Sequence, residues 1–346
     1  MRKQNIESRE PMVMNKTRLR IFLIAVVTAP LLLLCAPQAR ANEWSGTLGA
    51  EFVRIPIGAR QAAMGDASCA AVDDVNSIYW NPAGLAFIDM HEVTFSHAVW
   101  FADINYAHLA YAQRASNMGT FAGAISYLFM DPLEGRDKYG NPMSLFDAHS
   151  FVFDVSYAKK LPGRVLVGAN VKIINENIKG YSATTAATDL GVIFTEWGGM
   201  ENLTLGVVMK NIGFSQRFIS EAYPLPYSTR VGCCYGPLEG LILALDMDIP
   251  ADHNISLHLG SEYWLSPLFA VRAGYKTSVI ADLGPLAGLT CGLGLKWEIP
   301  GFNYRFLEME ALSSLHKFGL KWQLDYAFVP YGDLGYTHRI SLTAKF

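Results

Sequence analysis

The sequence predicts an all-β fold: a transmembrane antiparallel β-barrel of about 14 strands, with an N-terminal helical hatch that acts as a plug. The clearest observation is at the C-terminus, where residues 336–346 alternate strictly between an apolar and a polar face and end on Phe346. A soluble sheet can alternate in the same way. Here the alternation recurs along most of the chain and follows an export signal, which together favour a barrel with one face toward lipid and the other toward a wet lumen.

The N-terminus reads as a targeting segment. Three basic residues precede an apolar run at 21–34, and Ala39-Arg40-Ala41 has the small-x-small form of a cleavage site. The run is too short for a spanning helix of ~20 residues. We therefore expect residues 1–41 to be a cleaved signal peptide that directs the chain to the bacterial outer membrane. Lipid attachment at Cys35 is the weaker alternative, because a leucine precedes it.

Composition excludes some classes of function. Without residues 1–41 the chain carries 21 basic and 29 acidic residues, a net charge of −8, and no basic stretch with interleaved aromatics, so no nucleic-acid partner is expected. The whole chain is 51% hydrophobic and 17% charged, yet beyond the signal peptide no apolar stretch approaches ~18 residues. No cysteine spacing resembles a zinc site, so buried free thiols are expected at Cys69, Cys233, Cys234 and Cys291.

Residues 91–346 parse into alternating segments of roughly ten residues. In the clearest, at 318–328, Phe, Leu, Trp and Tyr occupy one face and Lys321 and Asp325 the other. Reversing the faces would place charges in hydrocarbon, at ~2–4 kcal/mol for each Lys or Arg at the midplane. The apolar face must therefore be the outside. The charges expected to face the lumen are Lys321, Asp325, Arg339, Lys345, Arg272, Lys276, Glu262 and Asp154.

An even number of strands places both ends of the barrel in the periplasm, where turns are short, whereas the external loops are long. Two predicted external loops, 130–147 and 213–224, are indeed long. The connection at 299–317 is long although it should be periplasmic, which indicates an insertion with a short helix around 307–315 or an error in the strand count. The expected strands lie near 91–98, 104–113, 119–129, 148–160, 165–178, 185–196, 202–212, 225–236, 240–249, 254–264, 267–277, 286–298, 318–328 and 336–346.

Residues 42–90 form the predicted hatch segment. An alanine-rich, helical stretch at 67–78 leads into Trp80-Asn-Pro-Ala-Gly84, where Pro82 keeps Asn81 out of the helical conformation. We place the segment inside the barrel, because the lumen of 14 strands would otherwise be open. Buried charges need partners. Asp73 and Asp74 are therefore expected to pair with Arg or Lys on the wall and so latch the hatch.

Four sequence motifs resemble the PorV/PorQ family of outer-membrane proteins: Gly58-Ala-Arg60 with Ala63-Met-Gly65, Asp73-Asp74, Trp80-Asn-Pro-Ala-Gly-Leu85, and Asp325-Tyr-Ala-Phe-x-Pro330 continuing to Thr337-His-Arg339. That family in turn resembles the FadL-type fatty-acid transporters. The resemblance implies a 14-stranded barrel closed by an N-terminal hatch with an Asn-Pro-Ala element at Trp80, Asn81, Pro82 and Gly84. The long segment at 299–317 departs from the family pattern.

The resemblance leaves two functions open. The first is a non-catalytic component associated with type IX-like protein secretion, with cargo or partner binding at the external loops. The second is a FadL-like channel for hydrophobic small molecules, with apolar side chains at Phe214, Phe218 and Ile219 near the mouth. Ordinary solvated loops that pack on themselves are the simpler interpretation of both loop sequences. Secretion is favoured on family grounds alone.

No enzyme is expected. Ser256 and His258 share one strand face, close enough for a nucleophile–base pair, but they point into the lumen without an obvious orienting carboxylate. No catalytic, metal or cofactor site is predicted. Outer-membrane lipid is an expected partner, contacted by the aromatics Tyr336, Trp322, Tyr326 and Phe328. The barrel-assembly machinery is another, reading Phe346 as the assembly signal, and secreted cargo or secretion components are the candidate protein partners.

Overall fold

A computed structural model describes residues 47–277, 285–299 and 319–346. The predicted signal peptide at 1–41 and the short helix predicted around 307–315 lie outside the described residues. Within them, no helix is both long and apolar enough to cross a membrane.

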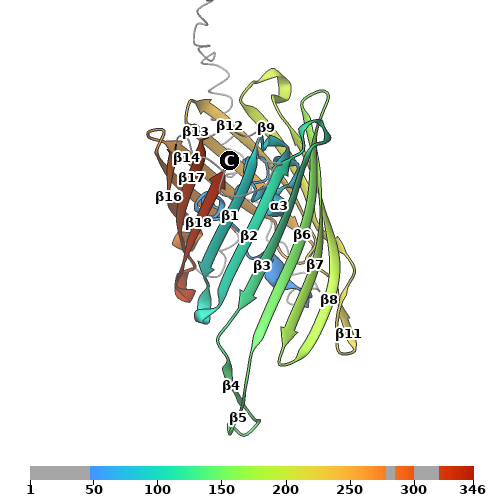
Figure 1. Cartoon of the computed structure of the whole chain (residues 1–346). Coiled ribbons are helices and arrows are strands. Elements are labelled where there is room, and N and C mark those ends of the chain that lie inside the picture. Colours follow the sequence, from blue (N-terminus) through green and yellow to red (C-terminus); the bar gives the residue numbers. More distant parts are fainter. Residues whose placement is uncertain (1–46, 278–284, 300–318) are drawn as a thin grey trace, which may run out of the picture. The chain divides into compact units, whose positions relative to one another are not determined.

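Fourteen antiparallel strands form one closed barrel, as the alternation predicted (Figure 1). Each strand pairs with its neighbour along the chain, and β1 pairs with β18 to close the ring. The barrel strands are β1 (His91–Val99), β2 (Asn105–Arg114), β3 (Thr120–Phe129), β6 (Ala148–Leu161), β7 (Val165–Ile178), β8 (Tyr181–Phe194), β9 (Leu203–Gly213), β12 (Ser228–Leu238), β13 (Leu241–Pro250), β14 (Ser256–Trp264), β15 (Phe269–Lys276), β16 (Leu289–Ile299), β17 (Leu320–Pro330) and β18 (Tyr336–Lys345).

The two loops predicted to be long each contain a small hairpin. The first is β4 (Leu133–Arg136) with β5 (Pro142–Phe146), and the second is β10 (Gln216–Phe218) with β11 (Glu221–Tyr223). Both project from the end of the barrel opposite the C-terminus (Figure 1). We call the hairpin end external and the end with short turns periplasmic. The strands in these loops were not predicted, because runs of three to five residues carry little periodicity.

The inner and outer faces of the wall follow the alternation of the sequence. In β18 the buried residues include Thr337, Arg339 and Ser341, whereas Tyr336 and Ile340 are 61% and 52% exposed. A slip of one residue would exchange these faces, so burial fixes the register.

The last residue also closes the ring. The Phe346 and His91 main chains exchange two hydrogen bonds, of 3.0 and 2.9 Å, and their rings stack at 5.4 Å.

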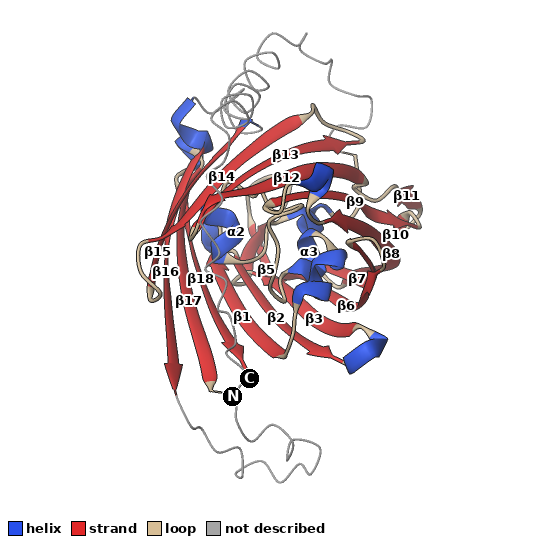
Figure 2. Cartoon of the chain, turned by 90° about the horizontal axis from the view of Figure 1, so that it is seen from above, coloured by secondary structure: helices blue, strands red, loops and turns tan. Residues whose placement is uncertain are grey.

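The lumen holds the segment that precedes the first strand (Figure 2). Its elements are η1 (Glu51–Arg54), α2 (Ala59–Ala63), α3 (Ser77–Trp80) and η2 (Pro82–Phe87). We call residues 47–90 the hatch. Further short helices lie in connections: η3 (Phe101–Asp103), η4 (Ser116–Met118), η5 (Trp197–Gly199), η7 (Pro285–Gly288) and η10 (Gly332–Leu334).

The helix predicted over 67–78 is wrong for most of its length, since only Ser77 and Ile78 are helical. The physical reason is tertiary hydrogen bonding. The main-chain N–H groups of Ser68 and Cys69 both donate to Oδ2 of Asp246 on the wall, at 2.7 Å each. Contacts with the wall thus replace the helical hydrogen bonds that the alanine-rich composition favours.

Candidate functional site

The Trp80-Asn81-Pro82 turn ties the loops of the hatch together. Asn81 is extended, with φ −159° and ψ 106°, and its Oδ1 accepts from the N–H of Ala83 at 3.2 Å, which caps η2. Its Nδ2 donates to the carbonyl of Cys69 at 2.8 Å, and the Trp80 indole donates to the carbonyl of Ile57 at 3.0 Å. Pro82 occupies the first turn of η2, where a missing N–H is tolerated.

Gly84 allows η2 to pack on the rest of the hatch. A Cβ at this position would lie 2.7 Å from both Oγ of Ser77 and Cγ2 of Val72. A side chain here would push the two segments apart. The predicted motif residues are therefore assembled into one buried turn.

A row of inward-facing glycines brings the main chain of the hatch against the wall. A Cβ on Gly274 would lie 2.0 Å from the amide nitrogen of Gly65, and one on Gly168 would lie 2.3 Å from the carbonyl carbon of Pro82. Such approaches are closed to any residue with a side chain. We call this row the glycine belt; its members are Gly168, Gly191, Gly206, Gly232, Gly260, Gly274 and Gly292.

The belt was missed in the sequence analysis, although a signal was present. Its members occupy inward-facing positions on β7, β8, β9, β12, β14, β15 and β16. In the register, Gly168 pairs with Gly191 and Gly260 with Gly274. Glycines aligned across strand pairs on a lumen face would have indicated where the hatch approaches.

Arg60 of α2 connects the hatch to the wall. Its guanidinium donates to Glu262 through Nε at 2.8 Å and Nη2 at 2.9 Å. Nη1 forms ion pairs with Asp73 and, at 3.5 Å, with Asp74. The expected direct pairing of Asp73 and Asp74 with wall cations is therefore wrong, because α2 of the hatch places Arg60 between them and the wall.

The wall side of this contact continues through side chains of β14, β15 and β17. Glu262 accepts from Nε of Arg272 at 2.6 Å, and Arg272 pairs with Asp325 at 2.9 Å. All three side chains are buried. A buried charge left alone is costly, whereas in this chain each charge lies next to an opposite one. Within the described residues, Nη1 and Nη2 of Arg272 and Oδ1 of Asp325 nevertheless make no hydrogen bond. We call Asp73, Asp74, Arg60, Glu262, Arg272 and Asp325 the latch network.

Other predicted lumen charges are distributed differently. Arg339 is 2% exposed and donates to the carbonyl of Pro56 at 2.6 Å. Lys321 shares the inward parity but is exposed at the periplasmic end, and within the described residues it has no place in the latch network. Lys210, not singled out from the sequence, places Nζ 3.6 Å from the ring centroid of Tyr79 in the hatch, a cation–π contact.

A second ion pair holds the hatch turn next to α2. The Asp66 carboxylate binds the Lys276 ammonium of β15 at 2.7 Å, and both groups are buried. Burial raises the pKa of Asp66, but the charges of Lys276 and Arg339 outweigh it and hold that pKa below its ordinary value. Asp66 is therefore ionised at neutral pH and fixes this turn electrostatically.

Ser256 and His258 do form the expected close pair, with Oγ 3.1 Å from Nε2. Nδ1 of His258 lies 2.8 Å from the carbonyl oxygen of Gly65. A carbonyl only accepts, so Nδ1 carries the proton and Nε2 accepts from the Ser256 hydroxyl. Both side chains are buried under the hatch. The pair acts as one more attachment of the hatch to the wall.

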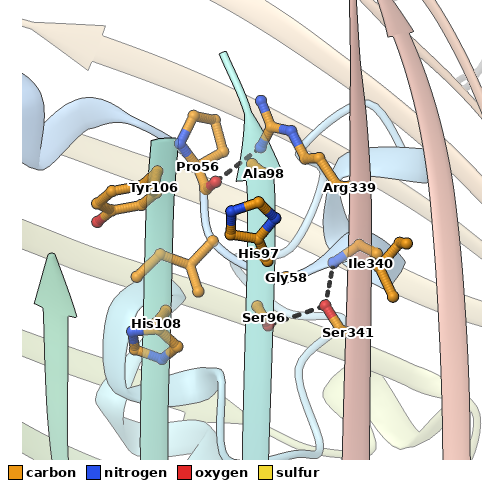
Figure 3. A pocket seen from close by; sticks show the side chains of 12 residues that line it. Pro56, Gly58, Ser96, His97, Ala98, Tyr106, His108, Arg339, Ile340 and Ser341 are labelled. Atoms are coloured by element: carbon orange, nitrogen blue, oxygen red, sulfur yellow. Dashed lines mark hydrogen bonds between the residues drawn. The ribbon is translucent and has the colours of Figure 1, made fainter. Parts of the chain in front are cut away.

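Hatch and wall also meet at the seam between β1 and β18 (Figure 3). The Ala59 N–H donates to Oγ of Ser341 at 2.8 Å, and that hydroxyl lies 2.8 Å from Ser96. The cavity left at this seam, lined by Pro56, His108 and Arg339 among others, measures about 10 Å³. That volume holds about one water molecule. The hatch therefore packs closely against this part of the wall.

The aromatic residues expected at the membrane boundaries lie on the outer face at the two ends of the barrel. Trp322 stacks with Trp297 at 6.3 Å at the periplasmic end. At the external end, the Tyr326 hydroxyl lies 2.7 Å from Nδ1 of His338, and Phe328 packs on Tyr336 at 5.4 Å. Aromatic side chains with polar tips suit the boundary between lipid and water. The four cysteines of the described residues are free. Cys69 is buried as expected, whereas Cys233 and Cys234 are half-buried and Cys291 is exposed on the outer face.

Comparison with known proteins agrees with this architecture. Residues 34–203, close to half of the chain, match the family model described as type IX secretion system protein PorV. A UPF0164 protein of Treponema pallidum (strain Nichols) is 24% identical over 199 residues, which cover 53% of this chain and 59% of that protein. The chain thus spans little more than half the length of this relative.

Two solved structures resemble the fold. The Pseudomonas putida toluene transporter TodX superposes with a TM-score of 0.56 at 12% identity, covering 84% of this chain and 98% of TodX. A Pseudomonas aeruginosa FadL homologue gives 0.50 at 12% identity, covering 89% and 99%. The barrel and its lumenal hatch give this chain the FadL-like fold, and residues 34–203 resemble the PorV family of type IX secretion system proteins.

Proposed function

We propose that this barrel is a non-catalytic outer-membrane component of a type IX-like secretion system, and that it binds a protein partner or cargo with its external end. The observation that carries the proposal is the fixed hatch. The latch network, the Asp66–Lys276 pair and the glycine belt attach it from α2 through to η2. A route for solute through the lumen would require many of these contacts to break, whereas a docking platform needs none to break.

The external hairpins supply a surface of suitable chemistry. Tyr139 and Leu145 on or beside β5 are 77% and 68% exposed, and Phe214 and Ile219 around β10 are 79% and 77% exposed. Exposed aromatic and aliphatic side chains on projecting loops are typical of protein-binding sites. The same side chains could instead collect hydrophobic solute, which is the second candidate, supported by the likeness to the toluene transporter TodX.

Co-purification tests the proposal. The barrel is extracted from its own membranes in mild detergent, and the proteins that travel with it are identified by mass spectrometry. We expect stoichiometric secretion components or secreted proteins, which are lost when the β4–β5 hairpin is replaced by a short turn. Trimming the opposite-end turn at 265–268 is the control and should leave them bound. A retained apolar small molecule in place of protein partners would favour uptake.

A further inference from the structure

The periplasmic end of the lumen contains a cavity of about 120 Å³ between the hatch and the wall. Arg60, Asp73 and Asp74 line it from the hatch, and Trp264, Lys296 and Lys345 line it from the strand ends of β14, β16 and β18. By the measure used for the seam cavity, in which ~10–15 Å³ holds one water, the space admits several waters or a small ligand the size of glycine. The proposed secretion role does not use this cavity.

The charged groups around the cavity are unevenly satisfied. Arg60 is fully engaged with Glu262 and the two aspartates, and Lys345 pairs with Glu92 at 2.7 Å. Lys296, by contrast, forms no ion pair within the described part of the chain. Its ammonium lies 3.8 Å from the ring centroid of Trp264. The side chain of Trp264 is held in turn by a 3.2 Å hydrogen bond from its indole N–H to Glu262.

The opposite charge is available in the same cavity. The side chain of Asp73 is 58% exposed, although one of its oxygens meets Arg60. Lys296 and Asp73 both line the cavity, yet they do not pair with each other within 4.0 Å. A lone anion would be repelled by the aspartates, and a lone cation by Arg60 and the two lysines. A ligand that carries both charges would form an ion pair with Lys296 and another with Asp73.

From this arrangement we infer that the cavity binds a small zwitterion, with its anionic group on Lys296 and its ammonium group on Asp73. Trp264 forms the apolar side of the site. Two sources share this chemistry, an amino-acid-like solute of the periplasm and the head group of a zwitterionic lipid. The site lies toward the periplasmic end of the described barrel, beside the latch network.

The test is an NMR titration of the full chain in detergent with isotopically labelled glycine, acetate and methylammonium. We expect glycine to bind at least about tenfold more tightly than either single-charge probe. Lys296→Gln should lower the affinity for glycine about tenfold, and Lys296→Arg should retain part of that affinity. Lys321→Gln, which changes a neighbouring lysine outside the cavity, should leave it unchanged. Asp73→Asn should also lower the affinity for glycine. Because Asp73 belongs to the latch network and its replacement can loosen the hatch, Lys296→Gln is the variant that decides the test.

Phosphoethanolamine distinguishes the two sources. If phosphoethanolamine binds more tightly than glycine, the natural ligand is a lipid head group. If it binds more weakly, the natural ligand is an amino-acid-like solute. Either result supports the site. Acetate or methylammonium binding as tightly as glycine would overturn the inference in favour of a simple ion site. Absence of binding by every probe at millimolar concentration would show that the cavity holds water only.

Discussion

Arg60→Gln is the substitution from which the structure predicts the largest loss of hatch attachment. The side chain of Arg60 is 9% exposed and meets Glu262, 2% exposed, and Asp74, 10% exposed. Removing one member of a buried ion network costs about 3–5 kcal/mol, because the remaining charges lose their partner. Glutamine keeps much of the volume but not the charge. We therefore expect the equilibrium between attached and detached hatch to shift by about two to three and a half powers of ten, since about 1.4 kcal/mol is tenfold.

Planar-bilayer conductance of the purified protein measures this shift, because a detached hatch opens the lumen to ions. Wild type should open rarely and Arg60→Gln often. Arg136→Gln is the matched control: Arg136 pairs with Glu134 at 2.8 Å on the exposed β4–β5 hairpin, where such pairs contribute little.

The double variant Arg60→Gln/Asp74→Asn should recover part of the loss, because it also removes a buried carboxylate whose ion-pair partner is Arg60. Equal opening of wild type and Arg60→Gln, with both proteins folded, would refute the latch network.

Two further predictions concern the rest of the hatch–wall contact. Gly274→Ala should release the hatch and raise conductance, because its Cβ would lie 2.0 Å from the amide nitrogen of Gly65. Gly123→Ala is the control and should have no effect, because the nearest neighbour of its Cβ would be 3.6 Å away. Channels that stay closed in both variants would contradict the role of the glycine belt. The Asp66 pKa is lowered in the folded protein, so its stabilising effect is complete above the unfolded value of about 3.9 and is lost as pH falls through the folded value. Denaturant unfolding at pH 5 and pH 2 should show a smaller acid loss for Asp66→Asn than for wild type, and identical losses would contradict the Asp66–Lys276 pair.

The strands were predictable because alternation over about ten residues carries both the period and the facing of each side chain. Lys321, Asp325 and Arg339 settle which face is lumenal, since hydrocarbon excludes charge. The hatch was predictable in place but not in detail. Its alanine-rich stretch has helical propensity, yet the N–H groups of Ser68 and Cys69 bind Asp246, which lies 178 and 177 residues further along the chain.

The latch network shows why pairings are harder to predict than faces. Arg60 lies in the motif that carries the family resemblance, but nothing local shows that a five-residue helix brings it to Asp73 and Asp74. The glycine belt could not be predicted for another reason. Each glycine alone reads as a weakness in a strand, and only the register reveals the members as one contact surface.

The central claim, a barrel that works with its hatch in place, can be tested by locking the hatch. Gly232→Cys places a Cβ 2.9 Å from Cβ of Cys69, closer than the ~3.5–4.5 Å of disulfides, and 2.0 Å from Oδ1 of Asp246. Unlike Gly168 and Gly274, which meet main-chain atoms of the hatch, Gly232 meets side chains, so the bond can form if the aspartate side chain turns aside. Gly232→Ser is the control, because it meets Asp246 in the same way without a thiol. Our account predicts that the oxidised variant retains the same co-purifying proteins as the serine control. Two results would contradict this account. The first is loss of those proteins on oxidation and their recovery with reductant. The second is toluene uptake into liposomes that formation of the disulfide abolishes.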